Sequence, residues 1–136
     1  MLVVAPVCRH VDSGDVCNFS SWRSRGWCRM ELAAALLARH NLRILVSRGE
    51  VTPDFLGPRD AFLLPVGFGN FTCCTLAHEI DGKAMPCDKA KVHGLVEVML
   101  DAKVNYFRET GRLVDMRLFA CYRPAFQAGS DVEEPV

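Results

Sequence analysis

Apolar positions in the first third of the chain form two short unbroken runs separated by a helical repeat. Residues 2–7 show no alternation, which is typical of a strand buried on both faces of a parallel sheet, and Pro6 marks its end. Residues 42–46 form the second run. Between the runs, spacings of three and four predict a well buried helix that stops at Asn41, with Trp27, Met30, Ala34, Leu37 and Ala38 on one side. Strand, helix and strand in this order predict a parallel βαβ unit with a right-handed crossover.

The segments on either side of this unit lack such periodicity. Residues 8–21 are rich in Asp, Ser, Gly and Asn and predict a loop, in which Ser20 or Ser21 caps the following helix. Residues 49–65 contain three prolines and predict an irregular connection, with a short strand at residues 61–64.

The second half predicts a hairpin followed by helices. Residues 71–80 and 83–87 flank Asp81-Gly82, a dipeptide that suits a tight turn because both central residues need positive φ. Asp88 then caps a long amphipathic helix that ends at Gly111. Residues 113–122 fit both periods, and we favour a helix that Pro124 ends. We expect one domain over residues 1–128 and a disordered acidic tail at residues 129–136.

Composition and charge exclude several classes. The 136 residues carry no net charge, which gives no global basic field for nucleic acid. The apolar N-terminal stretch is only seven residues long and has no basic flank, so neither a signal peptide nor a membrane span is predicted. Seven cysteines, an odd number, without a secretory signal indicate reduced thiols and a cytoplasmic location.

The densest chemistry lies in residues 21–32, which contain both tryptophans, three arginines and one carboxylate, Glu31. If the segment is helical from about Trp27, Glu31 lies one turn beyond it on the same face, beside the indole. Glu31 is then a catalytic candidate, and four neighbours are candidates for ligand binding: Trp22, Arg25, Trp27 and Arg29. The alternative is structural: the tryptophans pack the helix on the sheet, and Glu31 pairs with Arg25 or faces water.

A second group holds enough soft ligands for zinc: Cys73, Cys74, His78, Cys87 and His93. Its spacing matches no known zinc finger, and adjacent cysteines in a strand point to opposite faces, although a hairpin brings one of them near Cys87. No metal ligand is therefore assigned, and a zinc-binding structural module is kept as the last alternative. A catalytic thiol at Cys28 or Cys8 has no flanking motif.

Two family resemblances rest on the tryptophan segment. Trp22-x-x-Arg25-Gly26-Trp27-x-x-x-Glu31-Leu32 resembles a box of fungal heterokaryon-incompatibility domains, and Trp27-Cys28-x-x-Glu31-Leu32 resembles one of Toll/interleukin-1 receptor (TIR) domains. The whole chain also resembles a group of dinoflagellate proteins that share Arg-Gly-Trp-Cys-Arg, Phe-Thr-Cys-Cys and Pro-Cys-Asp-Lys segments.

The TIR resemblance implies an incomplete flavodoxin-like, three-layer α/β domain without its N-terminal βαβ portion. It implies a cytoplasmic signalling or self-association module, whose N-terminal strand edge pairs with a protein partner or a second copy. The alternative it implies is an NAD glycohydrolase, with NAD as substrate and no cofactor. Glu31 would then stabilise the oxocarbenium-like transition state at the nicotinamide ribose, with arginines on the pyrophosphate and an indole stacked on a ring.

Overall fold

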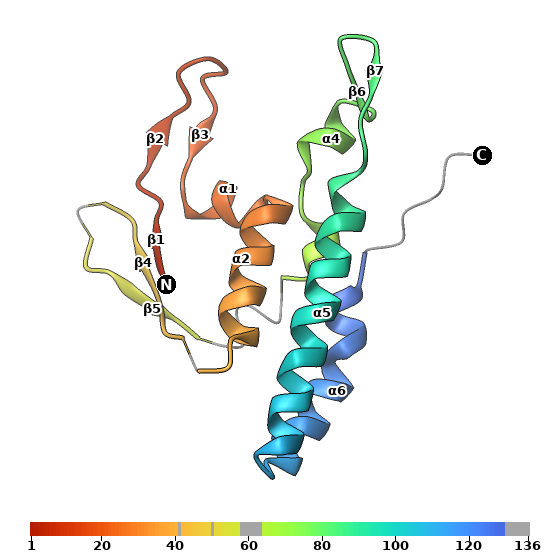
Figure 1. Ribbon diagram of the computed structural model, residues 1–136. Coiled ribbons are helices and arrows are strands. Elements are labelled where there is room, and N and C mark those ends of the chain that lie inside the picture. Colours follow the sequence, from red (N-terminus) through yellow and green to blue (C-terminus); the bar gives the residue numbers. More distant parts are fainter. Residues whose placement is uncertain (41, 50, 58–63, 130–136) are drawn as a thin grey trace.

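The computed structural model describes residues 1–40, 42–49, 51–57 and 64–129 and has a mixed α/β architecture (Figure 1). A three-stranded sheet lies on one side of helix α2 (Gly26–Leu37), and the paired helices α5 (Asp88–Glu109) and α6 (Leu113–Gln127) lie on the other. Leu32 and Ala35 of α2 pack on the sheet, while Ala33 and Leu37 pack on the helical pair. Helix α2 therefore joins two hydrophobic cores, with an apolar side chain facing each.

The predicted parallel βαβ pairing is confirmed. Strand β1 (Leu2–Val4) pairs in parallel with β4 (Ile44–Ser47), and α2 lies between them in the chain. A third strand, β5 (Asp54–Leu56), pairs antiparallel with β4 inside the stretch predicted to be irregular. Three residues between Pro53 and Gly57 are too few to show a period of two, which is why the pattern missed this strand.

The expectation that β1 is buried on both faces is wrong. Val3 is buried against α2, but Leu2 and Val4 are 61% and 64% exposed. Leu2 lies opposite Leu45, which lies opposite Phe55, so an apolar row crosses the second face of the sheet. Among the described residues nothing covers this face, and the third layer of the expected architecture is not seen there. An unbroken apolar run shows that both faces are apolar, not that both are covered.

Residues 8–21 are more ordered than predicted. They form the hairpin of β2 (Cys8–Arg9) and β3 (Val16–Cys17), followed by helix α1 (Phe19–Ser24). Asn18, not Ser20 or Ser21, is the N-cap: its side chain accepts from Ser21 N–H, and the Ser21 hydroxyl accepts from Asn18 N–H. This capping box starts α1 before the tryptophan segment. The extended backbone of Arg25 then separates α1 from α2, so the segment forms two helices.

The predicted hairpin around Asp81-Gly82 forms, but it is short. Only β6 (Glu79–Ile80) and β7 (Lys83–Ala84) pair, and the two turn residues adopt the expected positive φ of 51° and 73°. The first half of the predicted strand is instead helical, as α4 (Thr72–Thr75) after the 3-10 turn η1 (Val66–Phe68). Thr75 N–H donates to the carbonyl of Phe71, which closes the first turn of α4.

The two C-terminal helices are confirmed, with different ends. Cys87 is the N-cap of α5 and Asp88 its first residue, and α6 continues through Pro124 to Gln127. A proline this near the C-terminus removes only one helical N–H donor, and Phe126 beyond it is buried. No helix within the described ranges is both long and apolar enough to cross a bilayer. Helix α2 ends at Leu37 with Ala38 as its C-cap, so the predicted stop at Asn41 is too late. The predictions at residues 61–63 and for the tail at 130–136 lie outside the described residues.

The buried Lys103 fastens α5 to the end of α2. It donates from Nζ to the carbonyl of Ala38, the C-cap of α2, and lies 5.0 Å from the ring centre of Phe107. Burial, followed by the nearby charge of Arg112, lowers the pKa of this ammonium. The bond satisfies a carbonyl that the helix end would otherwise leave without a partner.

Candidate metal centre

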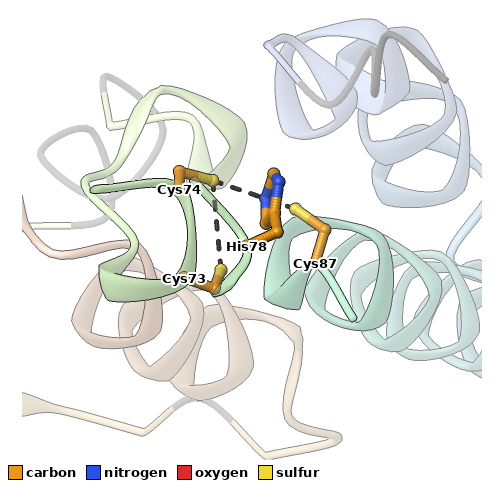
Figure 2. A group of neighbouring side chains, drawn as sticks. All are labelled: Cys73, Cys74, His78 and Cys87. Carbon is orange, nitrogen blue, oxygen red and sulfur yellow. Dashed lines mark hydrogen bonds between the residues drawn. The ribbon is translucent and has the colours of Figure 1, made fainter. Parts of the chain in front are cut away.

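Three cysteines and one histidine converge at the top of α5 (Figure 2). Cys73 and Cys74 come from α4, His78 from the turn that follows it, and Cys87 from the N-cap of α5. One ligand atom from each residue lies within 4.8 Å of all the others. The chain thus brings together a Cys₃His set, one of the ligand sets of structural zinc sites.

The sulfur spacing fits a tetrahedral ion. The Sγ atoms of Cys73 and Cys74 are 3.9 Å apart, and those of Cys74 and Cys87 are 3.8 Å apart. In a tetrahedral site with Zn–S bonds of about 2.3 Å, neighbouring sulfurs are about 3.8 Å apart. Both of these sulfur separations match those of thiolates that share one zinc ion.

His78 has a ring nitrogen that is left without a partner in the described part of the chain. Its Nε2 atom is buried and has no hydrogen-bond partner among the described residues. A buried polar atom without a partner costs about 1–3 kcal/mol. The backbone is strained at the same place, since Ala77 and His78 have φ of 50° and 59° in the left-handed region. Strain of this kind is kept where a particular side-chain position is needed, here beside three sulfur atoms.

Backbone hydrogen bonds hold the strained turn. The N–H of His78 donates to the carbonyl of Cys73 at 2.8 Å, and the N–H of Met85 donates to the carbonyl of His78 at 2.8 Å. The first bond ties the imidazole to the helix that carries two of the cysteines. The second ties it to the strand that leads to Cys87.

The surroundings of the thiols disfavour their ionised form when no cation is bound. Desolvation, followed by the hydrogen-bonded sulfurs of Cys87 and Cys73, raises the pKa of the Cys74 thiol to about 11. Ionising several adjacent thiols therefore needs a compensating positive charge. Two features support the thiolate form once that charge is present: Asp88 N–H donates to Cys73 Sγ at 3.3 Å, and Cys87 lies at the positive end of the α5 dipole.

The sequence argument against a metal site assumed that Cys73 and Cys74 lie in a strand, and this assumption is wrong. Cys73 and Cys74 lie in a helix, where successive side chains are about 100° apart and not on opposite faces as in a strand. His78 lies beyond the C-cap of α4, in a turn with left-handed backbone, so no regular spacing in the sequence marks the cluster. His93, the fifth residue of the predicted group, lies apart on α5, where its Nε2 is 3.9 Å from Glu97 Oε1.

The Arg-Gly-Trp segment packs against this centre. Gly26 N–H donates to the carbonyl of Asn70, and Asn70 N–H donates to the carbonyl of Ser24. A Cβ atom on Gly26 would overlap the ring of Phe71, so only glycine fits there. Trp27 Nε1 donates to Asp88 Oδ2 at 3.2 Å, next to the candidate ligand Cys87. The motif thus binds both ends of the segment that carries the four candidate ligands.

The other candidates from the sequence are spread over the surface of α1 and α2. Arg29 donates to the carbonyls of Arg23 and Pro65, and Trp22 stacks on Phe19 with ring centres 5.8 Å apart. Arg25 and Trp27 do share an open cavity of about 770 Å³ with Cys28 and Asp88. Desolvation, followed by the charge of Glu31, raises the pKa of the Cys28 thiol, which argues against a reactive thiolate there.

Glu31 lies outside that cavity. It is exposed and lines a separate hollow with apolar neighbours, among them Met1, Met30 and Leu42. The described residues that line this hollow include no tryptophan or arginine. Arg25 and Trp27 therefore line one cavity, and Glu31 lines another.

No protein-family model, curated protein or solved structure matches this chain. The TIR and heterokaryon-incompatibility resemblances, and the catalytic role of Glu31, stay predictions.

Proposed function

We propose that this chain is a zinc-binding domain, in which Cys73, Cys74, His78 and Cys87 hold one structural zinc ion. The observation that carries the proposal is the convergence of three sulfurs and an imidazole within 4.8 Å, with sulfur separations that match a zinc tetrahedron. Four protein ligands fill the coordination sphere and leave no open position for a substrate. The ion is accordingly assigned a structural role, not a catalytic one.

Zinc at this position would join elements that have few other contacts. Helix α4 has four residues and the strands of the β6–β7 hairpin have two each, too short to be stable alone. A shared ion links them to the N-terminus of α5. Through Phe71 and Asp88 the same segment packs on Gly26 and Trp27 of α2. The ion thus supports the contact between the two hydrophobic cores.

The direct test is metal content and geometry. The purified chain should bind one zinc ion, and substitution by Co²⁺ should give the visible absorption of a tetrahedral site together with thiolate-to-cobalt charge transfer. Cys73→Ser and His78→Ala should each weaken zinc binding by at least tenfold. Cys121→Ser, which changes an exposed cysteine outside the cluster, should bind zinc as the native chain does. Native affinity in Cys73→Ser and His78→Ala together would overturn the assignment.

Zinc affinity should also fall as the pH falls. Zinc binds thiolates, and in the metal-free fold Cys74 keeps its proton up to a pKa of about 11, against its ordinary 9.0. Each zinc ion must displace thiol protons, so apparent affinity rises with pH through the neutral range. A titration with a competing chelator at several pH values measures this slope, and a flat profile would exclude thiolate ligands.

A second candidate function is self-association of a TIR-like signalling module through β1. It is supported by the parallel β1–β4 pairing across α2, by the edge position of β1 and by the exposure of Leu2 and Val4. An edge strand offers unpaired backbone groups to a second copy. Sedimentation velocity should show a dimer that Val4→Lys disrupts, whereas Val98→Lys, at a similarly exposed site on α5, does not. A monomer at all concentrations would rule this candidate out.

A further inference from the structure

The four candidate zinc ligands differ in their access to solvent. Cys73 is 1% exposed, and the unpartnered nitrogen of His78 is buried. Cys87 is half-buried at the start of α5, and Cys74 is exposed. A dissolved reagent that reacts with thiolates therefore reaches Cys74 first.

Cys74 also has a second thiol in position to react with it. Its Sγ is 3.8 Å from that of Cys87, which lies on a different element. The Cys73 sulfur is as near, at 3.9 Å, but a bond between adjacent residues would close a small strained ring within α4. Cys73 Sγ is in addition held by the N–H of Asp88. The pair that can form an ordinary disulfide is Cys74 with Cys87.

We propose that Cys74 is an oxidation site for hydroperoxides, and that its oxidation forms a Cys74–Cys87 disulfide and releases the zinc ion. This inference rests on the proposed zinc site. It assigns the exposed ligand a second chemistry that the three other ligands do not share.

The reaction balances with a hydroperoxide as the oxidant. The Cys74 thiolate attacks one peroxide oxygen; an S–O bond forms, the O–O bond breaks, and the hydroxide that leaves takes up a proton from the buffer and becomes water. The Cys87 thiolate then attacks the Cys74 sulfur; the S–S bond forms, the S–O bond breaks, and a second hydroxide leaves and is protonated. Two thiolates lose two electrons, hydrogen peroxide becomes two waters, and two protons are consumed. The zinc ion keeps only Cys73 and His78, which do not retain it.

The consequence is a reversible change of linkage. Zinc joins α4, the His78 turn and α5, whereas the disulfide joins α4 and α5 alone. The His78 turn, with its strained backbone, then has no ligand to hold it. A thiol reductant and zinc together restore the first state.

The experiment treats the zinc-loaded chain with hydrogen peroxide and follows zinc with a chromogenic chelator, while free thiols are alkylated for peptide mapping. Trypsin cleaves after Lys83, between the two cysteines, so the disulfide joins two peptides that are otherwise separate. We expect one zinc released per disulfide formed. Cys74→Ser should form no joined peptides under the same peroxide treatment, whereas Cys73→Ser should still form them.

The outcomes separate this inference from the zinc assignment. If the native chain binds zinc but keeps it in excess peroxide, or if Cys74 goes to sulfinic acid with Cys87 still alkylated, the oxidation proposal fails and the zinc site stands. If the chain binds no zinc, the proposed function fails. Peroxide treatment of the zinc-free chain then still shows whether Cys74 and Cys87 pair, and a disulfide between other cysteines would overturn the inference.

Discussion

The tryptophan segment is compact in the sequence but its side chains make separate contacts, whereas the cysteine segment is spread along the sequence but its side chains meet. Residues 21–32 form the denser pattern in the sequence, yet their side chains make separate contacts: Trp27 with Asp88, Arg29 with two carbonyls, and Glu31 facing solvent. The cysteines and His78 are spread over residues 73–87 without a familiar spacing, yet they meet at one point. Density along the chain did not indicate a shared site, whereas turns between short elements produced one.

The difference follows from local geometry. Successive side chains of a regular helix such as α2 point in different directions around its axis, and even Trp27 and Glu31, which are four residues apart, line different hollows. A short helix, a left-handed turn and a hairpin reverse the chain within a few residues and bring their side chains together. Variants that remove the cluster of cysteines and His78, and matched variants in the tryptophan segment, test this difference.

Removing zinc should have the largest effect. A ligand that binds only the folded state stabilises it by about 4 kcal/mol when its free concentration is a thousand times its dissociation constant. Chelation should therefore lower the melting temperature of the native chain by several degrees, measured by calorimetry. His78→Ala, already deficient in zinc, should lose much less on chelation. An equal melting temperature with and without chelator would show that the ion does not support the fold.

Gly26→Ala should have the next largest effect, because the new methyl group meets the Phe71 ring. Overpacking of this kind costs about 1–3 kcal/mol, which urea unfolding resolves. Gly94→Ala is the matched control: a Cβ atom there meets nothing within 4 Å, and alanine in mid-helix stabilises by about 0.5–1 kcal/mol. Phe71→Leu should relieve the clash in a double variant, and full additivity of the two changes would contradict the assigned contact.

The sequence predicts the long elements of this fold but not the short ones, nor the contacts that the short ones make. The periodicity of residues 27–38 and 88–111 was sufficient for α2 and α5, and the two apolar runs for the parallel β1–β4 pair. Strand β5 and helices α1 and α4 were missed because elements of three to six residues have no measurable period, and their ends depend on a cap or a turn. The convergence of Cys73, Cys74, His78 and Cys87 was not predicted for the same reason, since assigning Cys73 and Cys74 to a strand separated their side chains.

Trp27→Phe should have a smaller effect than Gly26→Ala. Phenylalanine keeps an aromatic ring but removes the N–H that donates to Asp88. That bond, followed by Lys91, holds the pKa of the Asp88 carboxyl below its ordinary value. A carboxyl group whose pKa is lower in the folded chain than in the unfolded chain stabilises the fold at pH values above the unfolded pKa. This contribution is lost as the pH falls through the folded pKa. Native and variant chains should accordingly differ in stability near neutral pH and converge in acid. An NMR titration in which the Asp88 pKa is the same in both would contradict the contact.

Glu31→Ala should have the smallest effect and gives the sharpest test of the sequence motif. Glu31 is exposed, lies in a hollow apart from Arg25 and Trp27, and makes no ion pair among the described residues. Substitution at such a position changes stability by no more than about 0.5 kcal/mol and should leave zinc content unchanged. Incubation with NAD completes the comparison: a site formed by Glu31 alone, without a facing arginine or indole, should release no nicotinamide above the level of the Ala variant. If the native chain released nicotinamide and Glu31→Ala abolished that release, the motif would carry catalysis after all. The rest of the site would then come from residues that the described structure does not bring to Glu31.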